Sequence, residues 1–186
     1  MKSLLKSLAI PACILFAACG NGNSETASDT TSTATADTSS KTMQNNNKAE
    51  QDFVNYAVPG NTKEIIWLKA GIAKSKNKEI KKHASMMLAD HEKLDATVKT
   101  YLGNHSALSV PSVDTSNVVN INDKKGSAWD SAWTNKMVED HGELLTKLEN
   151  SQKNVKDTAL LSIINSTIPI VESHLAMVKA VKVSGK

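Results

Sequence analysis

Two eight-residue segments of the chain repeat one pattern fifty positions apart, MLADHEKL at 87–94 and MVEDHGEL at 137–144. Both lie in stretches whose apolar residues recur every three or four positions, which is the period of an amphipathic helix. In each segment the histidine falls on the apolar stripe, so the pattern predicts two helices that each bury an imidazole. Buried polar groups need partners, and any fold of this chain has to supply them.

Four stripes of this kind are present, and they predict an all-α fold. A long segment rich in Gly, Pro, Ser, Asn and Asp at 103–124 separates the second stripe from the third. Two short links around one long link are typical of a ferritin-like four-helix bundle, in which a crossover joins two helical hairpins. We expect the helices at about 48–75, 77–101, 127–148 and 157–181 of a bundle domain covering residues 48–183.

Two prolines fall inside these stripes. Pro59, followed by Gly60, is expected to break or kink the first helix, and Pro169 to kink the last. Proline removes a backbone donor and clashes with the preceding turn, so both helices should be interrupted there.

The N-terminus has the pattern of an export signal over residues 1–18. Lys2 and Lys6 precede a short apolar run that ends in small residues before Cys19. Such a run is too short to span a bilayer as a helix, so it indicates a processed segment. It resembles a bacterial lipoprotein signal, and we expect Cys19 to carry the lipid.

Residues 20–47 are nearly all Asn, Ser, Thr, Ala, Asp and Gly. A segment of this composition buries too little apolar surface to fold, so 19–47 should be a lipidated cysteine followed by a disordered tether. The protein would then be an exported lipoprotein of the inner or outer membrane, facing the periplasm or the cell surface.

The charge of the chain excludes one class of partner. All 22 positive residues are lysine, and once Lys2 and Lys6 are removed 20 remain against 19 acidic residues. This balance gives no basic footprint for nucleic acid, and the lack of arginine disfavours bidentate capture of phosphate. We therefore expect the membrane as a partner, with a second copy or another envelope protein beside it, and no nucleic acid.

The candidate site follows from the depth of each residue along its helix. His91 and His141 both fall about 21 Å into their helices, near mid-height. Along the helix axes, the heights of Glu64 and His91 differ by only ~5 Å. The heights of His174 and His141 differ by about nine residues, or ~13 Å. Depth alone therefore places His174 outside the central cluster.

A metal site is one interpretation of these residues. Imidazole and carboxylate side chains suit zinc, iron, manganese or copper, and bundle cores commonly hold such ions. The Glu-x-x-His motif of di-iron bundles is absent from the sequence. Adjacent Asp and His also point about 100° apart, so one ion cannot easily take both from one helix. The ligands of such a site would be Glu64, Asp90, His91, Asp140 and His141.

A structural polar core is the other interpretation. Asp90 would pair with His141 and Asp140 with His91, which satisfies four buried groups without an ion. The polar core would then comprise Asp90, His91, Asp140, His141 and His174. Nucleophile–base catalysis has little support, because no serine lies on a recognisable elbow or opposite a placed histidine. We assign no catalytic residue.

Taken together, several short segments resemble the DUF4142 family, a bacterial group classed with ferritin-like four-helix proteins. The resemblance covers about residues 50–182 and implies a helical bundle, an exported location and a membrane-associated label, without an agreed reaction. The matching positions are Phe53-Val54, Glu64-Ile65, Asn77, Ile80, Met87 to His91, Ala128 to Asp130, Met137 to His141, Glu149, Ile168-Pro169 and His174-Leu175.

Two functions remain open from the sequence. The first is a lipid-anchored envelope protein with a non-enzymatic binding or structural role, for example in stress tolerance. The second is a metal-binding or redox bundle for iron, copper or zinc in the periplasm. Metal content separates the two, because only the second requires a transition metal as cofactor.

Overall fold

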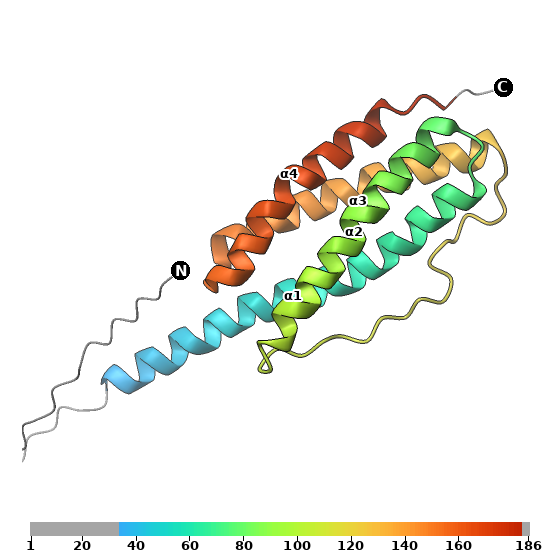
Figure 1. Cartoon of the computed structure of the whole chain (residues 1–186). Helices are drawn as coiled ribbons and strands as arrows, with labels where there is room; N and C mark the ends of the chain where they lie inside the picture. The colour runs from blue at the N-terminus through green and yellow to red at the C-terminus, as the bar shows by residue number, and fades with distance from the viewer. Residues whose placement is uncertain (1–33, 184–186) are drawn as a thin grey trace, which may run out of the picture.

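A computed structural model of the chain describes residues 34–183. The predicted signal peptide at 1–18, the expected lipidation site Cys19 and the predicted tether up to residue 33 lie outside the described residues. Within 34–183 the structure consists of four helices and contains no strand, which confirms the all-α prediction. The helices are α1 at Ala34–Lys74, α2 at Lys78–Gly103, α3 at Ser127–Asn154 and α4 at Thr158–Ala180 (Figure 1).

Side-chain caps start two of the helices where the sequence predicts them. The Asn77 side chain accepts hydrogen bonds from the backbone N–H groups of Glu79 and Ile80, and Asp157 accepts from Leu160 N–H. These bonds satisfy amides that have no partner inside the first turn. The starts of α2 and α4 therefore follow from single polar residues.

The first helix begins earlier than predicted. It begins at Ala34 rather than near residue 48, so residues 34–47 are helical where the sequence predicts part of the tether. No glycine or proline occurs between Ala34 and Val58, so nothing in the backbone stops the helix from extending toward the N-terminus. Figure 1 shows this part of α1 projecting beyond the other three helices.

The two prolines do not end their helices. Pro59 lies inside α1 and Pro169 inside α4, and each helix is continuous through its proline. Packing of one face against neighbouring helices outweighs the loss of a single backbone bond, which costs ~3 kcal/mol in an unsupported helix.

The long connection at 104–126 makes α2 and α3 run in the same direction. Ile80 near the start of α2 packs in one apolar cluster with Trp129 near the start of α3. Tyr101 and Leu148, near the ends of the same helices, share a second cluster. The connection therefore runs along the bundle, as Figure 1 shows, and the ferritin-like crossover is confirmed.

Neighbouring helices in the bundle are α1 with α2 and α3, and α4 with α2 and α3. The helices α2 and α3, which carry the repeated Asp-His pairs, consequently face each other across the diagonal. By length and composition α4 alone among the described helices is apolar enough to cross a membrane. Its stripe of Leu160, Ile164, Val171 and Val178 is nevertheless fully part of the bundle core.

The core is divided into two apolar clusters with a polar layer between them. The first cluster contains Leu68, Met87, Met137 and Val178, one residue from each helix. The second contains Phe53, Tyr101, Leu148 and Val171, again one from each. Between them along the four helices lie four buried polar residues, Glu64, His91, His141 and His174.

Gly71 permits the closest helix contact in the first cluster, and its replacement tests that packing. A Cβ at position 71 would lie 2.8–2.9 Å from the Trp133 ring, closer than packed atoms allow. Trp133 is fully buried and its Nε1–H donates to Trp67 O at 2.9 Å, so the ring cannot move freely. We expect Gly71→Ala to lower the free energy of unfolding by about 1–3 kcal/mol in urea titrations.

Gly60→Ala in the same helix is the matched control. No heavy atom lies within 4 Å of a Cβ at position 60. Alanine there should leave stability unchanged or raise it by about 0.5–1 kcal/mol, because it lowers the entropy of the unfolded chain. Equal stability of the two variants would contradict the close contact at Gly71.

Candidate metal centre

Three histidines from three different helices meet in the polar layer. His91 of α2, His141 of α3 and His174 of α4 are 3%, 1% and 2% exposed. Their ring centroids form a nearly equilateral triangle with sides of 5.7, 5.6 and 5.4 Å. A ligand nitrogen from each ring lies within 4.8 Å of one from each of the others, so a single ion can reach all three.

Each imidazole uses one nitrogen to bond an oxygen on the outside of the triangle. His141 Nδ1 donates to the backbone carbonyl of Met137 at 2.9 Å, and His174 Nε2 donates to Asp90 Oδ2 at 3.0 Å. His91 Nδ1 lies 2.7 Å from Asn61 Oδ1. The Asn61 amide N–H₂ donates to the His91 backbone carbonyl at 3.1 Å, which turns the amide oxygen toward the ring.

These outer bonds fix the tautomer of all three rings. A carbonyl or carboxylate oxygen only accepts, so the N–H of each neutral imidazole has to point outward. The remaining nitrogens, His91 Nε2, His141 Nε2 and His174 Nδ1, are buried and have no hydrogen-bond partner among the described residues. Three buried lone pairs therefore belong to three rings that touch one another, which is the donor arrangement of a metal site.

The three unpartnered nitrogens do not bind protons at neutral pH. Burial, followed by the neighbouring His141 and His174, lowers the pKa of His91 to about 3. Burial, followed by the charge of His174, lowers the pKa of His141 to about 4. Burial also lowers the pKa of His174, although its hydrogen bond to Asp90 acts in the opposite direction. All three rings are neutral and able to act as ligands.

The distances are suitable for a transition metal. An equilateral triangle with sides of 4.8 Å, the upper limit here, places each nitrogen about 2.8 Å from its centre. Zinc–imidazole bonds are about 2.0–2.1 Å long, so each nitrogen has to move inward by about 0.7 Å at most. Neutral imidazole ligands suit zinc, copper, iron and nickel, and three of them leave a fourth position open.

Glu64 of α1 lies beside this triangle. Its Oε1 is 3.8 Å from His141 Nδ1, which is the outward nitrogen of that ring. Only 7% of Glu64 is exposed, and Oε1 has no hydrogen-bond partner within the described residues. Burial, followed by the negative charge of Asp140, raises the pKa of Glu64 to about 8. The carboxyl group is therefore mostly protonated at neutral pH and supports His141 from outside.

The crossed Asp–His pairs expected from the sequence are wrong. Asp90 bonds His174 rather than His141, and Asp140 bonds Lys136 Nζ at 2.7 Å rather than His91. Each aspartate precedes its histidine by one residue and points about 100° away from it around the helix. With the histidines turned to the centre, the aspartates turn toward the surface, and 46% of the Asp90 side chain is exposed.

Of the five ligands expected for a metal, the structure brings His91 and His141 together. Glu64, Asp90 and Asp140 lie around them without joining the group that can share an ion. Asp90 instead holds the third ligand, His174, in place. Asn61 holds His91 and carries no sequence signal beyond its position three residues before Glu64, on the same face of α1.

The placement of His174 is the main correction to the depth calculation. The third helix ends at Asn154, about one and a half turns beyond the last apolar residue used to estimate its end. His141 lies 13 residues before that end, and His174 lies 16 residues after the start of α4. The difference of three residues is about 5 Å rather than ~13 Å, so His174 joins the cluster.

Comparison with known proteins agrees with the fold. Residues 32–181 match the family described as "Domain of unknown function (DUF4142)". No curated protein matches the sequence. A solved structure, described as a dodecameric thioferritin, the bacterioferritin-related protein from Bacteroides fragilis, has a TM-score of 0.59 at 13% identity. The alignment covers 77% of this chain and 90% of that one, and the likeness concerns the fold alone.

The lowered histidine pKa values predict that the metal-free protein loses stability in acid. The unfolded chain binds protons on its histidines near pH 6.5, whereas folded His91 and His141 bind them near pH 3 and 4. The stability that these two neutral histidines contribute is therefore complete above about pH 6.5 and falls as pH decreases toward 4, while the raised pKa of Glu64 adds stability over the same range and offsets part of this loss. At about 1.4 kcal/mol per pKa unit, His91 alone accounts for about 3 kcal/mol at pH 4. Urea titrations of chelator-treated protein between pH 7 and 4 measure this loss.

His91→Gln should make the pH dependence shallower, because glutamine does not titrate. His83→Gln is the control, since His83 is a half-buried histidine on the same helix outside the triangle. The control should keep the slope of the unchanged protein. Equal pH slopes in the unchanged protein and in His91→Gln would mean that the His91 imidazole is not buried in its neutral form.

Proposed function

Because this chain belongs to the DUF4142 family, whose description assigns no function, we propose one from the site: the protein binds one transition-metal ion, zinc or copper. His91, His141 and His174 hold the ion. The observation that carries the proposal is the set of three buried ring nitrogens without a hydrogen-bond partner, one from each ring. When bound, the ion accepts the three lone pairs and offers a fourth position to a further ligand.

The outer hydrogen bonds support this assignment. In metal sites the histidine nitrogen opposite the ion commonly donates to a carboxylate, carbonyl or amide oxygen, and here all three do so. A purely structural polar core would instead give the inward nitrogens hydrogen-bond partners, either other imidazoles or neighbouring carboxylates. The structural alternative thus leaves three polar nitrogens unexplained, whereas a metal ion explains each of them.

The ligand set favours binding over oxidative chemistry. Di-iron bundles use four carboxylates and two histidines from Glu-x-x-His motifs, and the sequence has no such motif. Carboxylates stabilise higher iron oxidation states, whereas neutral imidazoles suit zinc and copper. We therefore place the protein among those that store, buffer or deliver a metal ion rather than among oxidases.

We further propose that the protein does this outside the cytoplasm, as a lipoprotein anchored through Cys19. This part rests on the sequence: the basic residues, the short apolar run and the small residues before Cys19. The segment between Cys19 and the start of α1 at Ala34 would hold the bundle close to a membrane surface. Incorporation of labelled palmitate, lost on Cys19→Ala, tests the anchor independently of the metal.

Metal content is the direct test of the site. Protein purified without chelators or a His-tag should contain about one equivalent of zinc or copper by elemental analysis. His141→Ala and His174→Ala should each reduce the content by at least tenfold, because two imidazoles hold an ion far more weakly than three. His83→Ala is the matched control and should retain the ion. Metal-free protein that also takes up no zinc or copper, with no rise in melting temperature, would overturn the proposal.

The outer hydrogen bonds provide a second test. Asp90→Ala removes the acceptor for His174 Nε2, and we expect a 10–100-fold weaker affinity for the ion. Asp95→Ala is the control, because Asp95 lies on the same helix and forms an ion pair with Lys99 instead. Competition with a chromogenic chelator measures both affinities. Equal affinities would show that Asp90 does not position His174 for the metal.

A further inference from the structure

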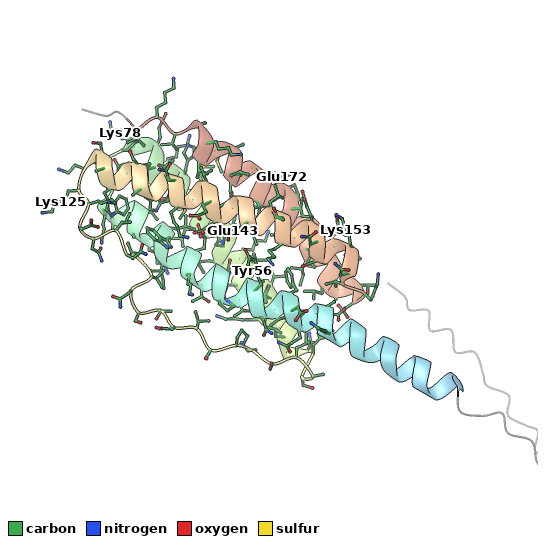
Figure 2. The ribbon with its side chains drawn as sticks, turned by 180° about the vertical axis from the view of Figure 1, so that it is seen from behind. Tyr56, Lys78, Lys125, Glu143, Lys153 and Glu172 are labelled. Atoms are coloured by element: carbon green, nitrogen blue, oxygen red, sulfur yellow. The ribbon has the colours of Figure 1, made fainter. Side chains whose placement is uncertain are left out.

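A cavity of about 460 Å³ lies beside the histidines, on the side of α1 and α3. Residues from all four helices and from the connection at 114–120 line it, with Thr167 from α4. Figure 2 shows this face of the molecule, with Tyr56 on α1 and Glu143 on α3 labelled near the seam between the two helices. The volume is within the range of sites that bind small molecules.

The cavity is elongated and changes in character along its length. On α1 its lining residues extend from Phe53 to Trp67, which corresponds to about 21 Å along the helix. Toward Phe53 the walls are apolar and include Val98 and Leu148. Glu64 lies toward the other end, eleven residues or ~16 Å from Phe53. The space therefore suits a linear molecule with an apolar body and one polar end.

Glu64 is the carboxyl group at that end which has no hydrogen-bond partner for its Oε1, and His91 and His141 line the same space. Its Oε1 is buried and unbonded among the described residues, although the side chain lines an open space. Lys136, whose charge lowers the pKa of Glu64, forms its own ion pair with Asp140 at 2.7 Å instead. A buried carboxyl group in this position costs free energy unless a bound molecule supplies the missing partner.

The surrounding charges decide which partner fits. Burial raises the pKa of the Tyr56 hydroxyl, and the carboxylates of Glu143, Asp140 and Glu64 raise it further. The ammonium group of Lys147 lies over the Tyr56 ring, 5.5 Å from its centroid, so a cation is already stable against this wall. The lining contains more carboxyl groups than ammonium groups: Glu64, Asp95, Asp114 and Asp140 against Lys63 and Lys136.

We propose that this cavity binds a linear amphiphilic amine, whose ammonium group pairs with Glu64 and whose apolar chain lies along α1 toward Phe53. An anionic head would meet the carboxylate of Asp140 on the same lining, whereas an ammonium group supplies the hydrogen-bond donor that Glu64 lacks. A buried ion pair requires an apolar surrounding and good geometry, and the adjoining apolar walls provide both. The site needs no metal ion, although His91 and His141 of the triangle also line the cavity.

Three eight-carbon probes that differ only in the head group test this site: octylamine, 1-octanol and octanoate. Isothermal titration of the purified protein should show octylamine binding at least tenfold more tightly than either of the others. Glu64→Gln should weaken octylamine binding at least tenfold and leave 1-octanol within threefold, because only the charge is removed. Asp114→Asn, at the exposed rim of the same cavity, is the matched control and should change octylamine affinity by less than threefold.

A second variant tests the apolar end. Ala57→Leu fills part of the cavity wall and should weaken octylamine and 1-octanol by a similar factor of at least five, with circular dichroism reporting an intact bundle. Both chelator-treated protein and His174→Ala should still bind octylamine, which separates this site from the proposed metal centre. Octanoate binding as tightly as octylamine, no binding of any probe, or unchanged octylamine affinity in Glu64→Gln would overturn the proposal.

Discussion

Three imidazole lone pairs that converge in a buried layer are the constraint around which this bundle is built. Each ring donates its N–H to an oxygen outside the triangle, so the inward nitrogens have no partner within the described residues. An unsatisfied buried group costs about 1–3 kcal/mol, and three of them cost several. The two apolar clusters above and below offset that cost in the folded protein. Such an arrangement can fold without a ligand, and its free energy of unfolding would increase most if an ion accepted the lone pairs.

The crossover connection is what makes three helices contribute to one layer. Since α2 and α3 run in parallel, His91 and His141 lie at similar distances from their helix starts, 13 and 14 residues in. The α4 helix runs in the opposite direction and brings His174 to the same height from the other end. α1 contributes no imidazole, but its Asn61 and Glu64 contact the outward sides of His91 and His141. Every helix thus has a defined role in fixing the rings.

Much of the architecture was predictable, because it depends on local patterns. The 3.6-residue periodicity, the caps at Asn77 and Asp157 and the length of the central connection predict the helices and the crossover. The depth of His91 and His141 follows from counting residues from helix starts, and the Asn77 cap marks the start of α2. Counting from the end of the third helix failed, because residues 149–154 extend it beyond its apolar stripe, and His174 was misplaced as a result.

The partners of the histidines could not be predicted, because they depend on how each helix is rotated. Asp90 and Asp140 occupy equivalent positions in the repeat, yet Asp90 contacts a histidine of α4 and Asp140 contacts Lys136 of its own helix. The residue four positions earlier differs, because Lys136 precedes Asp140 whereas Met86 precedes Asp90. The local pair of Asp140 can therefore be read from the sequence, whereas the contact of Asp90 with α4 depends on the tertiary arrangement.

The ferritin-like frame and the chemistry of its centre are separate properties of this chain. A bundle at 13% identity shares the fold, and a fold of this kind can host many different sites. The carboxylates that would make this layer a di-iron centre are displaced: Asp90 and Asp140 face outward, and Glu64 lies on the outer side of His141. What remains at the centre is a neutral, three-nitrogen set. Because neutral ligands do not cancel the charge of a dication, such a set favours either a monovalent ion such as Cu⁺ or Zn²⁺ with an anion in its fourth position.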